Sequence, residues 1–208
     1  MNKKIFIIFA LFSFMVFAKE NIDYEGFRYL ALPANISTNS YKNLAYHSNI
    51  DKLHSNKRSG KKILLDFEGR LIYGSAWNKE LNLPDVYNFQ PWSIDLSPEF
   101  NFTEKQRIFN IWRIVGDKFF NYDVTTELLP DWDLNKDGKD DDKYGIRVLV
   151  TTTIPKVKIG SLGYQNSFGV KERNTVLILG RNLHDQTKNI ADHIIQQLEF
   201  AIGARDVK

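Results

Sequence analysis

The run Lys62-Ile63-Leu64-Leu65-Asp66-Phe67 limits the fold more than any other segment of this 208-residue chain. Its apolar residues are nearly continuous, which is typical of a strand that is buried on both faces of a sheet. Residues 145–153 and 174–180 are rich in β-branched side chains and predict two further strands. A short strand over 123–127 and a hairpin partner over 71–74 complete this part of the expected sheet.

Two amphipathic helices are predicted beside these strands. Thr103-Glu104-Lys105-Gln106 has the pattern of a capping box, and apolar residues then recur at helical spacing to about Phe120. The second helix is predicted over 186–202, and Gly203 stands where a helix C-terminal glycine belongs. The order of elements predicts an α/β or α+β fold, in which a twisted mixed sheet packs against two long helices.

The N-terminus has the features of a secretory signal peptide. Lys3 and Lys4 precede an apolar stretch over 5–18 that is short for a membrane span, and Val16-Phe17-Ala18 suits a cleavage site. An uncleaved membrane anchor is the alternative. We therefore expect a secreted or periplasmic bacterial protein, with no stable membrane insertion after residues 1–18 are removed.

The rest of the chain is expected to form one domain. Residues 19–60 are polar and read as a leader, a pro-segment or a first hairpin, while 61–208 form the main domain. Without Lys3 and Lys4, 26 basic residues face 25 acidic ones, so the net charge of about +1 argues against a nucleic-acid partner. The chain has no cysteine, which excludes disulfides, thiolate metal ligands and thiol catalysis.

An acidic loop at 133–142 is a candidate calcium site. Oxygen ligands alternate along Asp133-Leu134-Asn135-Lys136-Asp137, and Gly138 allows a sharp bend. The predicted ligands are Asp133, Asn135, Asp137, the carbonyl of Lys139, and Asp141. Position twelve of an EF-hand would be Tyr144 instead of glutamate, so the loop is not a complete EF-hand. The alternative is a solvated acidic turn.

Several blocks of sequence also share their order and spacing with a known family. They include Leu64-Leu65-Asp66-Phe67-Glu68-Gly69, Pro91-Trp92-Ser93-Ile94-Asp95 and Tyr144-Gly145-Ile146-Arg147-Val148, with further blocks at 74–78 and 111–127. Over about residues 62–206 the chain resembles the secreted bacterial zinc metallopeptidases of the metzincin group, the matrixin- and reprolysin-like enzymes. The resemblance implies a zincin-like fold, a zinc cofactor and peptide hydrolysis.

The same resemblance implies that the catalytic motif has been lost. In the family, His-Glu-x-x-His-x-x-Gly-x-x-His supplies three zinc ligands and a general base. Its positions fall here on Gln196, Gln197, Phe200, Gly203 and Asp206, so only the glycine is kept. Amide and phenyl groups do not make a zinc site, and Gln197 cannot accept a proton as a base. We expect no bound zinc and no proteolysis. We also expect the family's small C-terminal subdomain to be missing, since the chain stops at Lys208.

Two alternatives to a non-catalytic, partner- or peptide-binding domain stay open. One is an active zinc-dependent metalloendopeptidase whose non-standard ligands are His184, His193 and Asp206, gathered with Asp192. The other is a calcium-stabilised structural or adhesion module that uses the acidic loop. His193 itself reads as an ordinary surface or boundary histidine, and His184 reads as a loop residue.

Overall fold

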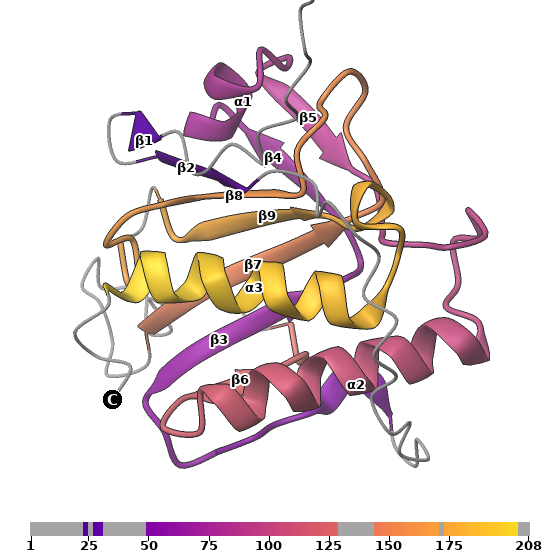
Figure 1. Cartoon of the computed structure of the whole chain (residues 1–208), viewed down its shortest axis with the longest axis vertical. Coiled ribbons are helices and arrows are strands. Elements are labelled where there is room, and N and C mark those ends of the chain that lie inside the picture. Colours follow the sequence, from indigo (N-terminus) through magenta and orange to yellow (C-terminus); the bar gives the residue numbers. More distant parts are fainter. Residues whose placement is uncertain (1–22, 25–26, 31–48, 129–143, 171–172, 204–208) are drawn as a thin grey trace, which may run out of the picture.

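The computed structural model describes residues 23–24, 27–30, 49–128, 144–170 and 173–203, which form a mixed α/β fold (Figure 1). The strands are β1 (Asp23–Tyr24), β2 (Phe27–Leu30), β3 (Lys61–Asp66), β4 (Arg70–Tyr73), β5 (Val86–Phe89), β6 (Asp123–Thr125), β7 (Tyr144–Thr151), β8 (Ser161–Tyr164) and β9 (Thr175–Leu179). The α-helices are α1 (Ala76–Glu80), α2 (Phe102–Lys118) and α3 (Thr187–Ile202), and the 3-10 turns are η1 (Ile50–Lys52) and η2 (Gly180–Leu183).

Seven of the strands form one sheet in the order β1-β2-β8-β9-β7-β3-β6. The four strands from β9 to β6 are parallel to one another, whereas β8, β2 and β1 each run antiparallel to their neighbours. Parallel neighbours need long crossover connections, and α2 lies in the crossover from β3 to β6. The sequence-based prediction of a mixed sheet with two long helices is confirmed at this level.

The sheet is covered on both faces, and the two faces carry different layers. Helices α2 and α3 lie side by side on one face (Figure 1) and pack against alternate strand residues such as Val148 and Val150. The intervening Leu149 packs on the opposite face with Trp77 of α1 and Phe89 of β5. Burial on both faces explains the continuous apolar run of β3.

The prediction that residues 71–74 form a hairpin with β3 is wrong. The segment Arg70–Tyr73 pairs with β5 in a separate two-stranded sheet, because both edges of β3 are already occupied by β6 and β7. The chain turns at Gly69, shortly after β3. Its φ of +76° favours glycine, and an added Cβ would lie 2.4 Å from the carbonyl oxygen of Phe89, so no side chain fits there.

The start of α2 also differs from the prediction. The capping box uses Asn101 and Glu104 instead of Thr103 and Gln106. Glu104 is fully buried, and its carboxylate accepts hydrogen bonds from the amide of Ile94 at 2.7 Å and from Asn101. This carboxylate therefore fastens the preceding loop to the helix. At the other helix, Gly203 ends α3 with a φ of +82°, as expected.

Among the residues that the structure describes, no helix is long and apolar enough to cross a bilayer.

Candidate functional site

Three of the five predicted motif positions lie in the C-terminal half of α3, and Gly203 directly follows the helix. Gln196 is exposed, Gln197 is fully buried, and Phe200 is half-buried. Asp206 and the five calcium candidates (Asp133, Asn135, Asp137, Lys139 and Asp141) lie outside the described residues. The structure therefore shows the surroundings of the three substituted positions but not those of the acidic loop.

Gln197 is held between β8 and β2. Its Nε2 donates to the backbone carbonyl of Arg28 and to the hydroxyl of Ser161, each at 3.2 Å. Its Oε1 is buried and has no hydrogen-bond partner among the described residues. A Cβ on Gly163 would lie 2.8 Å from this oxygen, so the glycine gives the amide its space. The Gln197 side chain thus joins α3 to β2, the strand that lies next to β8.

His193 lies one turn earlier on the same face of α3, and it is buried, whereas the sequence predicts an ordinary surface or boundary histidine. Its Nδ1 lies 2.9 Å from the hydroxyl of Ser161. Burial lowers the pKa of His193 to about 4, although the carboxylate of Asp192 opposes this effect. The imidazole is therefore neutral at pH 7, and Nδ1 can accept the Ser161 hydroxyl hydrogen.

Arg28 of β2 contacts α3 at the other two substituted positions, Gln196 and Phe200. Arg28 donates from Nη1 to the carbonyl of Gln196 at 3.3 Å, and its guanidinium lies 5.3 Å from the centre of the Phe200 ring. The guanidinium of Arg28 therefore lies over Phe200, the position at which the resemblance expects a metal ligand. Together with the amide of Gln197, these groups do not fit a zinc ion.

Of the alternative zinc ligands, Asp206 lies outside the described residues, and the other three are not brought together. His184 is exposed at the left-handed end of η2, whereas His193 points toward β8, and Asp192 is bonded to Lys188 on the helix surface. Within the described ranges, no group of three or more His, Cys, Asp or Glu is arranged to hold a metal ion.

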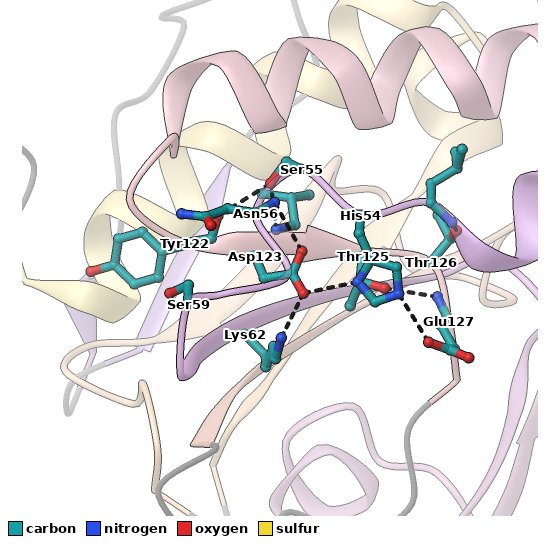
Figure 2. Close-up of polar contacts among 12 residues, drawn as sticks. His54, Ser55, Asn56, Ser59, Lys62, Tyr122, Asp123, Thr125, Thr126 and Glu127 are labelled. Carbon is teal, nitrogen blue, oxygen red and sulfur yellow. Dashed lines mark hydrogen bonds and ion pairs between the residues drawn. The ribbon is translucent and has the colours of Figure 1, made fainter.

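A second polar cluster, which sequence reasoning missed, joins residues 53–56 to β6 (Figure 2). His54 binds the carboxylate of Asp123 through Nδ1 at 2.8 Å and that of Glu127 through Nε2 at 2.9 Å. Asp123 is completely buried and also accepts a hydrogen bond from the ammonium of Lys62 at 2.6 Å. We call these four residues the His54 clamp.

The electrostatics of the His54 clamp favour an ionised Asp123. Burial alone would raise the pKa of this carboxyl, but hydrogen bonds from Lys62, His54 and the amide of Asn56 outweigh it and lower the pKa. Both nitrogens of His54 are occupied by carboxylates, and the nearby hydroxyl of Ser55 donates to the Tyr122 carbonyl. Both ring nitrogens of His54 thus join carboxylates of the β6 segment, and the Ser55 hydroxyl is bonded to a carbonyl and not to the imidazole.

No protein-family model, no curated protein and no solved structure matches this chain.

Proposed function

We propose that this chain is an exported zincin-like domain that acts by binding a protein or peptide partner and does not hydrolyse peptides. The signal-peptide pattern at residues 1–18 motivates export. The resemblance to metzincin metallopeptidases motivates the fold, and a mixed sheet covered on one face by two long helices is compatible with it.

One observation supports the loss of catalysis above all others. At the three positions where the resemblance expects two zinc ligands and a general base, the chain has Gln196, Gln197 and Phe200. The Gln197 amide is bonded to β2, and Arg28 lies against Phe200. Neutral amides and a phenyl ring neither bind a Lewis-acidic ion nor activate its water at neutral pH.

Elemental analysis and a cleavage assay test this proposal together. The mature protein, incubated with equimolar zinc and then dialysed, is expected to retain far less than one zinc per chain and to leave casein and a peptide library intact. The triple variant Gln196→His, Gln197→Glu, Phe200→His is the matched comparison, because it restores the motif chemistry on the same helix. Tightly bound zinc and chelator-sensitive cleavage by the unmodified chain would show that the proposal is wrong.

Calcium binding by the acidic loop is part of the proposal as a stabilising element. Asp133, Asn135, Asp137 and Asp141 offer the oxygen donors that a hard cation prefers, and extracellular calcium is abundant. A calcium-stabilised structural or adhesion module, with the acidic loop as its only site, is the second candidate function.

A further inference from the structure

The small sheet of β4 and β5 has an apolar outer face. It lies at one end of the molecule (Figure 1), on the face of the main sheet opposite α2 and α3. Side chains such as Ile72 and Phe89 point inward and pack on the core. The outer side chains of Leu71, Tyr73 and Val86 are 45%, 67% and 52% exposed. This outer face is remote from the substituted motif positions on α3, so it is independent of the proposed function.

The register of the hairpin determines which backbone groups of β4 point away from β5. The amide of Gly74 donates to the carbonyl of Asp85 at 2.6 Å, and bonded pairs alternate along an antiparallel ladder. Ile72 is therefore bonded to β5, whereas the N–H and C=O groups of Leu71 and Tyr73 point to the outer edge of β4. No strand of the described residues pairs with this edge. The same two residues thus offer exposed apolar side chains and backbone groups for pairing.

The outer edge of β5 is better protected than that of β4. Pro84 and Asp85 directly precede β5, and the carbonyl of Asn88 accepts a hydrogen bond from the side chain of Gln90 at 3.3 Å. Proline and charged residues are the means by which natural proteins keep other strands from an edge. Residues 71–73 of β4 include neither. An edge that is apolar and unprotected favours the addition of another strand.

We propose that β4 pairs with β4 of a second copy of this chain, antiparallel and across a two-fold axis at Ile72. This register places Leu71 of each copy opposite Tyr73 of the other, so the outward backbone groups of both residues find partners and their side chains form apolar cross-strand pairs. Arg70 falls opposite Gly74, where an added Cβ would meet nothing within 4 Å, so no like charges oppose each other. The edge is therefore complementary to itself, as a two-fold interface requires.

Sedimentation equilibrium of the mature protein tests the pairing. Because the contact is short, we expect a weak dimer that is monomeric at about 1 µM and mostly dimeric at about 1 mM. Leu71→Lys should raise the dissociation constant at least about tenfold, since a charged edge residue opposes strand addition. The matched control Val86→Lys changes an exposed apolar residue of the same face on β5 and should keep the dimer. A chain that stays monomeric at about 1 mM, or a dimer that both variants weaken equally, would overturn edge pairing.

Amide hydrogen exchange locates the contact within the strand. The N–H groups of Leu71 and Tyr73 should exchange more slowly as the protein concentration rises from about 10 µM to about 1 mM, while that of Ile72, already bonded to β5, should not change. Tyr73→Pro removes an N–H that β5 does not use, so this variant should be folded by circular dichroism and monomeric. If it does not fold, Leu71→Lys and the exchange rates still decide. A dimer in which the Leu71 and Tyr73 amides gain no protection would contradict the proposal.

Discussion

At the scale of single residues, the buried carboxylate of Asp123 holds two parts of the chain together. It is inaccessible to solvent and neutralises the Lys62 ammonium, whose side chain is only 7% exposed. In Asp123→Asn this ammonium loses its counter-charge inside the protein, so we expect a loss of about 3 kcal/mol in the free energy of unfolding. Chemical denaturation measures the loss. The control Glu127→Gln changes a carboxylate that is 41% exposed and should cost less than about 1 kcal/mol.

A second residue-scale prediction concerns His193 and pH. Its pKa is about 4 in the folded state and near the ordinary 6.5 when unfolded, so below pH 6.5 the unfolded chain binds the extra proton. Its contribution to stability is therefore complete above pH 6.5 and is lost as the pH falls toward 4, by about 3 kcal/mol in all. Denaturation curves at pH 7 and pH 4.5 measure this loss.

The variant His193→Gln isolates this residue from other titrating groups. Glutamine can keep a hydrogen bond to Ser161 but does not titrate, so the fall in stability between the two pH values should be clearly smaller. The exposed His184 provides the control, and His184→Gln should leave the pH dependence as it is in the parent. An unchanged slope in His193→Gln would contradict the assigned burial.

At the scale of elements, Gly160 just before β8 and Gly163 within it leave room for side chains of α3. A Cβ on Gly160 would lie 2.4 Å from Cε1 of His193 and 2.7 Å from Cδ2 of Leu183. We expect Gly160→Ala to destabilise the fold by about 2 kcal/mol, since the overpacked helix must shift. Thermal and urea denaturation measure the change. In a His193→Ala background the same substitution should cost much less, and additive costs would show that the helix contact is not the cause.

The same strand shows where prediction from sequence reaches its limit. Strands β3, β7 and β9 were predicted because their apolar runs are local signals. Ser161–Tyr164 was missed because it contains a serine and a glycine, which are explained only by contacts with His193 and Gln197 of the helix. The pattern of neighbouring residues cannot predict a side chain whose role is a contact with a residue more than thirty positions away.

The two candidate sites follow the same rule. The motif positions on α3 were found by resemblance, but the contact of Gln197 with the carbonyl of Arg28 joins residues 169 positions apart. The His54 clamp spans 69 positions between His54 and Asp123, and the local sequence around either residue does not predict their contact. Likewise, the pairing of β4 with β5 depends on which sheet edges other strands occupy. Such features become visible only when the topology is known.

At the scale of the whole molecule, the cysteine-free chain relies on its core, with α2 and α3 on one face of the sheet and α1 with β4 and β5 on the other. Strand β2 extends this sheet by pairing over its full length with β8. A stabilising ligand is therefore expected to act on the entire cooperative unit and to raise its single unfolding temperature.

Calcium is the ligand for which this expectation can be tested. At a hundred times its dissociation constant, calcium bound only by the folded state adds about 2.7 kcal/mol, which corresponds to a rise of roughly 5–10 °C in Tm for a domain of this size. Calorimetry of the chelator-treated protein with and without calcium measures the rise. In Asp133→Asn, Asp137→Asn the rise should disappear, because two carboxylate ligands are lost, while Asp51→Asn should keep it. Equal Tm values with and without saturating calcium would leave residues 133–141 as an acidic turn and would remove calcium from the proposed function.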